Sequence, residues 1–225
     1  MQPPARAAGG RAGAAGILAK MLHLASRSPR RRELLARLGV SFVALDVDIP
    51  EERAAHETPQ AYVARVAAGK AGAGLEQLAG LDGAVVIGAD TEVVLDGDVF
   101  GKPADSGEAA AMLARLSGRA HQVFSAVAVR AGGRLLEALS VSDVEFARLT
   151  PDQIAAYVAS GEPMGKAGGY AIQGAAEAFV ARLKGSYSGV MGLPLHETAR
   201  LLEQAGVRTR PGAQVSAPAK EGGRE

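Results

Sequence analysis

The sequence contains no cysteine among its 225 residues, and this absence removes several kinds of chemistry at once. Without thiols, the chain can have no disulfide framework, no cysteine nucleophile and no thiolate metal site. Proteins of the reducing cytoplasm do without disulfides, and we therefore expect a cytoplasmic protein.

Tryptophan is also absent, aromatic residues make up only 4%, and 25 basic residues nearly balance 24 acidic ones. Few aromatic rings give a poor base-stacking surface, and a net charge of +1 argues against a general nucleic-acid binder. No apolar run reaches the roughly 18 residues that a membrane-spanning helix requires. We therefore expect neither nucleic acid nor a membrane as a partner, and any phosphate binding must be local.

Hydrophobic residues make up 48% of the chain, which is enough for a substantial core, and strand and helix patterns are mixed along it. The predicted strands are 21–26, 41–49, 85–88, 92–95 and 177–187, with two long antiparallel strands within 121–149 around a Gly-Gly turn. Helices are predicted to open at Ser28, Thr58, Asp105, Thr150 and Pro194. This order predicts an α/β fold with a mixed, twisted sheet and flanking helices.

The two ends of the chain differ in composition from the rest. Residues 1–20 are rich in alanine and glycine and contain no acid, which predicts a disordered extension, with a transit peptide as the less favoured alternative. Residues 208–225 predict a disordered tail in the same way. The remaining 21–207 form one predicted domain, and Met21 is an alternative start.

An arginine cluster follows the first strand. Ser26, Ser28, Arg30 and Arg31 lie where that strand passes into a helix N-terminus. Positive charge is unfavourable at a helix N-terminus unless an anion binds there. The cluster therefore predicts a phosphate site, although a solvated basic face would give the same pattern.

Acidic residues follow two predicted strands. Asp90 and Thr91 come after a buried apolar run. The second strand is closed by four acids, Asp46, Asp48, Glu51 and Glu52. Carboxylates at such strand ends could share a Mg²⁺ ion, which prefers oxygen ligands and substrate phosphates. Acids in solvated turns remain the alternative reading for both groups. The four histidines are scattered, which argues against a zinc site.

Glycine-rich segments carry three lysines and one glutamine of interest. Lys70, Lys102 and Lys166 each follow a glycine and could meet phosphate oxygens, although most such lysines lie on the surface. Gln173 lies in "GGYAIQG", where its amide could read the polar edge of a base or simply belong to a turn. Neither a P-loop nor a dinucleotide fingerprint is present.

Six segments occur together in a familiar order: "LASRSPRRRELL", "GADTEVV", "GKP", "LSGRAHQVFSAVAV", "KAGGYAIQG" and "GSYSGVMGLPL". With them the chain resembles the Maf family of septum-formation-inhibitor-like nucleotide pyrophosphatases, from about Met21 to Gly206. The resemblance implies an α/β fold with a deep cleft, a homodimer, and a divalent cation, Mg²⁺ or Mn²⁺. It also implies hydrolysis of a nucleoside triphosphate between its α- and β-phosphates. Gly189 departs from the family pattern, in which asparagine is common at this position.

The same resemblance implies roles for particular residues. Asp90 would be the proton acceptor and, with Glu51, a metal ligand, and Lys70 and Lys102 would serve in catalysis. The residues implied to bind the substrate are Ser26, Arg30, Arg31, Thr91 and Gln173.

Three of these positions bear on the base. Arg30, Thr91 and Gln173 together match the subgroup that acts on dTTP, UTP and modified pyrimidine analogues. Two alternatives stay open: the same chemistry on another base, such as 7-methyl-GTP, and a nucleotide-binding regulator of cell division that needs no turnover.

Overall fold

A computed structural model describes residues 21–79 and 81–213 of the chain. Its strands are β1 (Leu22–Ala25), β2 (Phe42–Leu45), β3 (Val85–Leu95), β4 (Asp98–Phe100), β5 (Ala120–Ala131), β6 (Arg134–Phe146) and β7 (Val180–Lys184). Its α-helices are α1 (Pro29–Ala36), α2 (Pro59–Gln77), α3 (Ser106–Leu116), α4 (Pro151–Ala159), α5 (Tyr187–Met191) and α6 (Leu195–Gln204). Two short 3₁₀ helices are η1 (Ala167–Gly169) and η2 (Ala175–Phe179).

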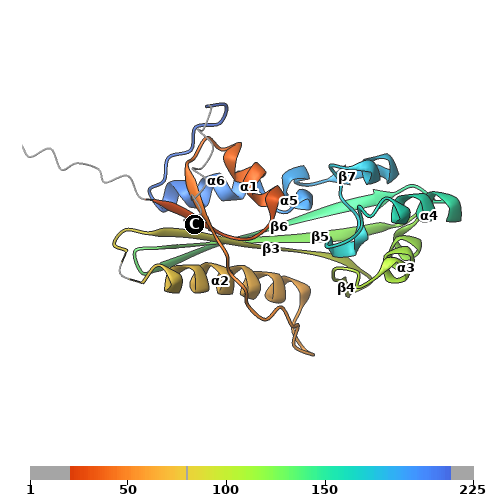
Figure 1. Cartoon of the computed structure of the whole chain (residues 1–225), viewed down its shortest axis with the longest axis horizontal. Coiled ribbons are helices and arrows are strands. Elements are labelled where there is room, and N and C mark those ends of the chain that lie inside the picture. Colours follow the sequence, from red (N-terminus) through yellow and green to blue (C-terminus); the bar gives the residue numbers. More distant parts are fainter. Residues whose placement is uncertain (1–20, 80, 214–225) are drawn as a thin grey trace, which may run out of the picture.

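The strands form one mixed sheet in the order β2-β1-β3-β5-β6-β7, with β4 paired to β3 outside this path. β1 runs parallel to β2 and β3, and all other pairs are antiparallel. α2 covers one face of the sheet, whereas α1, α5 and α6 lie over the other, as Figure 1 shows. The predicted α/β fold with a mixed sheet and flanking helices is therefore confirmed.

Helix-opening residues behave as their sequence predicted. The Ser28 hydroxyl accepts a hydrogen bond from the Arg31 amide, and Thr58 does the same for Ala61. Thr150 forms a complete capping box with Gln153. These bonds satisfy amide groups that the first helical turn leaves without partners.

The strand around Asp90 differs from its prediction. We expected separate strands at 85–88 and 92–95, but β3 runs unbroken through Asp90 and pairs with β5 from Val85 to Val94. Glycine and aspartate disfavour strands when considered locally, but pairing with a long neighbour overrides that preference. Asp90 therefore lies within a strand and not at its end.

Gly88 brings α2 unusually close to this strand. A Cβ atom at Gly88 would lie 2.4 Å from the Ala67 carbonyl oxygen and 2.6 Å from the Ala71 nitrogen. Only glycine permits such an approach of two backbones. The contact places Lys70 of α2 directly beside the strand.

The core consists of side chains on both faces of the sheet. On the α2 face, Val63 and Ala67 pack against Val94 and Phe124. On the opposite face the larger core includes Leu34, Leu35, Ile87, Leu113, Val127, Val129, Leu201 and Leu202. The sheet is thus held rigidly between two helical layers, which fixes the side chains that β3 presents.

A buried histidine predicts acid sensitivity of the fold. His121 Nε2 lies 2.8 Å from the hydroxyl of Tyr170, and its ring packs edge-on against Phe146. Burial lowers the pKa of His121 to about 4, whereas in the unfolded chain a histidine titrates near 6.5. Between these values the unfolded state binds more protons, so acidification from pH 6.5 to 4 should cost up to about 3 kcal/mol of unfolding free energy. Denaturant titrations of wild type and His121→Gln should show a flatter pH profile for the variant, and identical profiles would contradict this assignment.

Part of the segment expected to be a tail contacts the predicted domain. The Arg210 amide donates to the Leu38 carbonyl over 2.7 Å, so residues 208–213, expected to belong to the tail, lie against the end of α1. The expected extension at 1–20 and the rest of the tail, 214–225, lie outside the described residues. No helix among the described residues combines the length and apolar character needed to cross a membrane.

Candidate active site

A cleft opens where the strands beside β3 end. β1 pairs with β3 only as far as Ile87, and β4 pairs with it only from Val93 onward. In the described chain, the β3 edge from Gly88 to Glu92 therefore has no strand partner on this side. A cavity of about 540 Å³ lies here, within the usual range for a small-molecule site.

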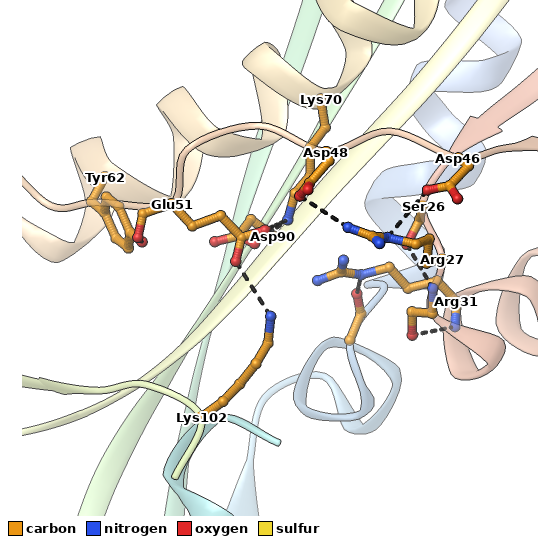
Figure 2. A network of polar contacts seen from close by, with 12 residues as sticks. Ser26, Arg27, Arg31, Asp46, Asp48, Glu51, Tyr62, Lys70, Asp90 and Lys102 are labelled. Carbon is orange, nitrogen blue, oxygen red and sulfur yellow. Dashed lines mark hydrogen bonds and ion pairs between the residues drawn. The ribbon is translucent and has the colours of Figure 1, made fainter. Parts of the chain in front are cut away.

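A carboxylate and lysine network crosses this cleft (Figure 2). Lys70 Nζ lies 2.8 Å from Asp90 Oδ1 and 2.7 Å from Glu51 Oε1, and Lys102 Nζ lies 3.3 Å from Glu51 Oε2. The side chains of Lys70 and Asp90 are only 10% and 6% exposed, so their interaction is weakly screened by solvent. The four residues predicted for catalysis and metal binding thus meet in one place.

Glu51 is held by backbone and side-chain contacts together. The Tyr62 hydroxyl of α2 donates to the Glu51 carbonyl oxygen over 2.7 Å, which fixes the loop that follows β2. Burial alone would raise the pKa of Glu51, but hydrogen bonds and charge from Lys70 and Lys102 outweigh it and lower that pKa. Glu51 is therefore an ionised partner for the two lysines near neutral pH.

The opposite wall of the cleft is cationic. Arg31 is held by its Nε, which donates to the Gly192 carbonyl over 2.9 Å, and its guanidinium points into the cleft (Figure 2). Burial, partly offset by Asp90, Glu51 and Glu92, lowers the pKa of Arg31; burial and the nearby Arg31 lower that of Arg30. Among the described residues neither arginine forms an ion pair, which leaves both available to an anion.

Ser26, another residue predicted for the phosphate site, directly follows β1. The residue is 5% exposed, and its hydroxyl accepts from the Ser28 amide over 3.2 Å. This bond turns the chain from β1 into α1, so that Ser26, Arg30 and Arg31 all line the cavity. The arginine cluster is thus not simply a solvated basic face.

Arg27 forms ion pairs with two of the acids that we expected near Asp90. Its Nε lies 3.2 Å from Asp46 Oδ1, and its Nη2 lies 2.9 Å from Asp48 Oδ1. All three side chains are more than half exposed. Asp46 and Asp48 therefore belong to a solvated rim of the cleft, which was the alternative reading of the sequence.

Thr91 faces the other side of β3 and ties the strand to α5. Its hydroxyl lies 3.0 Å from Ser125 Oγ and 3.4 Å from the Gly192 carbonyl oxygen. Ser125 in turn donates to the Gly189 carbonyl over 2.6 Å. Thr91 lines the cavity, and its contacts also support the carbonyl that anchors Arg31.

Gln173 lines the cavity from a turn that is held by hydrogen bonds on both sides of the residue. Before it, the Ala171 amide donates to the Tyr157 hydroxyl, and after it the Ala175 amide donates to Glu162. The Tyr157 hydroxyl also donates to Glu162 over 2.9 Å, which links these two partners. Gln173 therefore lies in a fixed turn at the end of the cleft that also holds Lys166.

Glu92 is a site residue that the sequence reasoning missed. It lines the cavity and is 9% exposed, and its buried Oε2 has no hydrogen-bond partner among residues 21–79 and 81–213. Burial, with the charges of Asp90 and Glu51, raises the pKa of Glu92 to about 8. The alternation of side chains along one strand would have indicated it, because residues two apart point to the same face. We missed it because we predicted a break in the strand at Asp90.

A comparison with protein families places these features in context. The family described as "Maf-like protein" matches residues 21–205, which carry the whole cleft. The chain belongs to the Maf family.

Individual Maf relatives are similar over most of their length. A protein of Xylella fastidiosa (strain 9a5c), named nucleoside triphosphate pyrophosphatase, is 63% identical over 183 residues, covering 81% of this chain and 97% of the relative. A protein of Xanthomonas oryzae pv. oryzae (strain MAFF 311018), named dTTP/UTP pyrophosphatase, is 59% identical over 188 residues, covering 83% and 99%. The family resemblance inferred from the sequence is therefore confirmed.

The Maf cleft has donors that fit a divalent cation. Asp90 Oδ2 is buried and finds no hydrogen-bond partner in the part of the chain that the structure describes, and carboxylate oxygens are the ligands that Mg²⁺ and Mn²⁺ prefer. No group of three or more acids, histidines or cysteines among the described residues is arranged as a complete cage. Mg²⁺ commonly needs only one or two carboxylates when substrate phosphates supply further oxygens.

Proposed function

We propose that this protein is a nucleoside triphosphate pyrophosphatase that converts dTTP and UTP, and modified pyrimidine analogues, to the monophosphate and pyrophosphate. The observation that carries the proposal is a buried carboxylate, Asp90, that shares one cavity with two arginines, neither of which forms an ion pair within the described part of the chain. The names of relatives about 60% identical support the same activity.

Asp90 is the general base of the proposed reaction. Lys70 donates to its Oδ1, and in the described part of the chain its Oδ2 has no hydrogen-bond partner. A water oxygen attacks phosphorus, its proton passes to the Asp90 carboxylate, and the bridging α,β P–O bond breaks to release pyrophosphate. General-base catalysis of this kind needs a carboxylate at a fixed distance from the water, and β3 supplies that rigidity.

The cationic groups stabilise charge on the phosphates. Arg30, Arg31 and Lys102 would contact the triphosphate, whose negative charge grows on the oxygens as the bond breaks. Asp90 and Glu51 are the residues expected from the sequence to hold the divalent cation. When bound, such a cation neutralises phosphoryl oxygens and the leaving pyrophosphate.

Product analysis tests the proposed reaction. Incubation of dTTP with protein and Mg²⁺ or Mn²⁺ should give equal amounts of dTMP and pyrophosphate, separated by anion-exchange chromatography. Release of dTDP and inorganic phosphate would instead identify a phosphatase and contradict the proposed cleavage.

Gln173 is expected to contribute to base selection. A uracil or thymine edge offers a carbonyl and an N–H, which an amide can pair simultaneously. Gln173→Ala should lower kcat/KM for UTP about 10- to 100-fold, since two hydrogen bonds are lost. The ratio of kcat/KM for UTP to kcat/KM for CTP should fall as well. Gln122→Ala, on the exposed surface of β5, serves as the matched control. An unchanged UTP-to-CTP ratio in Gln173→Ala would contradict this role.

A further inference from the structure

Glu92 is a cleft carboxylate that the protein itself leaves without a cation. It is more than nine-tenths buried, and in the described part of the chain no lysine or arginine forms an ion pair with it. Its buried Oε2 receives no hydrogen bond from any described residue. A buried polar atom without a partner is costly, and inside a cavity a bound ligand is one way to satisfy it.

The free oxygens of Glu92 and Asp90 lie on the same face of β3. The two residues are two positions apart in an unbroken strand, so both side chains point toward α2. Lys70 donates to Asp90 Oδ1, whereas Asp90 Oδ2 and Glu92 Oε2 are both buried and have no hydrogen-bond partner among the described residues. Two carboxyl groups on one rigid strand thus line the same cavity, and each has an oxygen without a protein partner in that part of the chain.

Glu51, the other acid expected to bind metal, is already occupied. Lys70 lies 2.7 Å from its Oε1 and Lys102 lies 3.3 Å from its Oε2. Each of its oxygens therefore has a cationic partner before any ligand arrives. A metal at Glu51 would have to displace an ammonium group, whereas a metal at Glu92 displaces none.

We propose that Asp90 and Glu92 together form the divalent-cation site of the cleft, with Glu92 as its second carboxylate ligand. This inference rests on the proposed function, which requires such a cation. Two hard oxygen donors suit Mg²⁺ or Mn²⁺, whose other positions water or phosphate oxygens can fill. Glu51 then serves to hold Lys70 and Lys102 in place.

Binding of Mn²⁺ to the protein alone tests the proposal without any nucleotide. Free Mn²⁺ is measured by electron paramagnetic resonance during titration of wild type, Glu92→Gln, Glu51→Gln and a control. Glu197→Gln is the matched control, because Glu197 Oε2 is also buried with no hydrogen-bond partner among the described residues, but Glu197 lies in α6 and lines a different hollow. Wild type and the control should bind one Mn²⁺ saturably and with the same affinity.

The variants separate the two candidate ligands. Glu92→Gln should weaken Mn²⁺ binding at least about 10-fold, while Glu51→Gln changes it less, because only the first variant removes a proposed metal ligand. Mn²⁺ should also raise the Tm of wild type but not that of Glu92→Gln, and unfolding scans without metal verify that the variant folds. Wild-type affinity in Glu92→Gln, or no saturable binding by wild type, would overturn the proposal. Since no nucleotide is present, either result is independent of whether the protein hydrolyses dTTP.

Discussion

Asp90→Asn is expected to lower kcat for dTTP and UTP by about 10⁴-fold while the protein remains folded. Asparagine keeps the shape of the side chain, and its carbonyl oxygen can still accept from Lys70, 2.8 Å away in the native protein. It cannot take a proton from water and is a poor ligand for a divalent cation. Steady-state pyrophosphate release measures the loss, and thermal unfolding measures the fold.

The alternative outcomes for Asp90→Asn are informative. A variant that retains near wild-type turnover would remove Asp90 from the role of base. A variant that is inactive and also unfolded would say nothing about chemistry, and Asp90→Glu is therefore measured beside it. The glutamate restores the carboxylate in a shifted position and should recover part of the activity if the carboxylate itself is required.

Lys70→Met is expected to lower the unfolding free energy by about 3–5 kcal/mol, which is more than we expect for Lys102→Met. Lys70 is the buried cation that joins Asp90 to Glu51, and methionine would leave both carboxylates without it. Breaking a buried pair by removing one partner costs more than the pair contributes, because an uncompensated charge remains. Denaturant titration of the metal-free protein measures this loss directly.

Lys102→Met provides the contrast. The Lys102 side chain is 63% exposed and touches only Glu51 in the network, so its removal should cost less than about 1 kcal/mol of stability. In Lys102→Met, kcat/KM for dTTP should nevertheless fall about 100-fold, because the variant lacks the ammonium group that we expect to contact the phosphates. Equal stability losses in the two variants would contradict the division between a lysine that holds the site and one that serves the substrate.

The start of each helix could be predicted because its information is local. Ser28, Thr58 and Thr150 each precede a proline, and each side chain accepts the amide hydrogen bond that its position predicted. The helix start predicted at Asp105 is also correct, since its carboxylate accepts from the Glu108 amide, and the Glu108 carboxylate in turn accepts from the Ala104 amide. Caps depend on a few neighbouring residues, which is why they can be inferred from the sequence.

The length of β3 could not be predicted because it depends on β5. Gly88, Asp90 and Thr91 interrupt the apolar pattern locally, yet ten residues of β3 pair in register with β5. Reading this stretch as two strands concealed the shared orientation of Asp90 and Glu92. The short elements β4 and α5 were missed for a similar reason, since tertiary contacts stabilise them more than their own sequences do.

The candidate site residues came from composition and family resemblance, but their grouping came from the fold. Arg30 and Arg31 were indicated by charge at a helix start, whereas the link from Lys70 to Glu51 joins a helix to a loop 19 positions earlier. Gly88 has no side chain, so α2 can approach β3 closely enough for Lys70 to reach the cleft. Such a role for a glycine can be recognised only once its neighbour is known.

The measurement that tests the central claim most directly is kcat/KM for pyrophosphate release across dTTP, UTP, CTP, dCTP, GTP and 7-methyl-GTP. Each nucleotide is assayed with Mg²⁺ and with Mn²⁺, using protein verified as folded. We expect high values for dTTP and UTP and values at least about 100-fold lower for the cytosine nucleotides. Preference for 7-methyl-GTP would contradict the base assignment, and no release from any nucleotide would contradict the enzyme and favour a nucleotide-binding regulator.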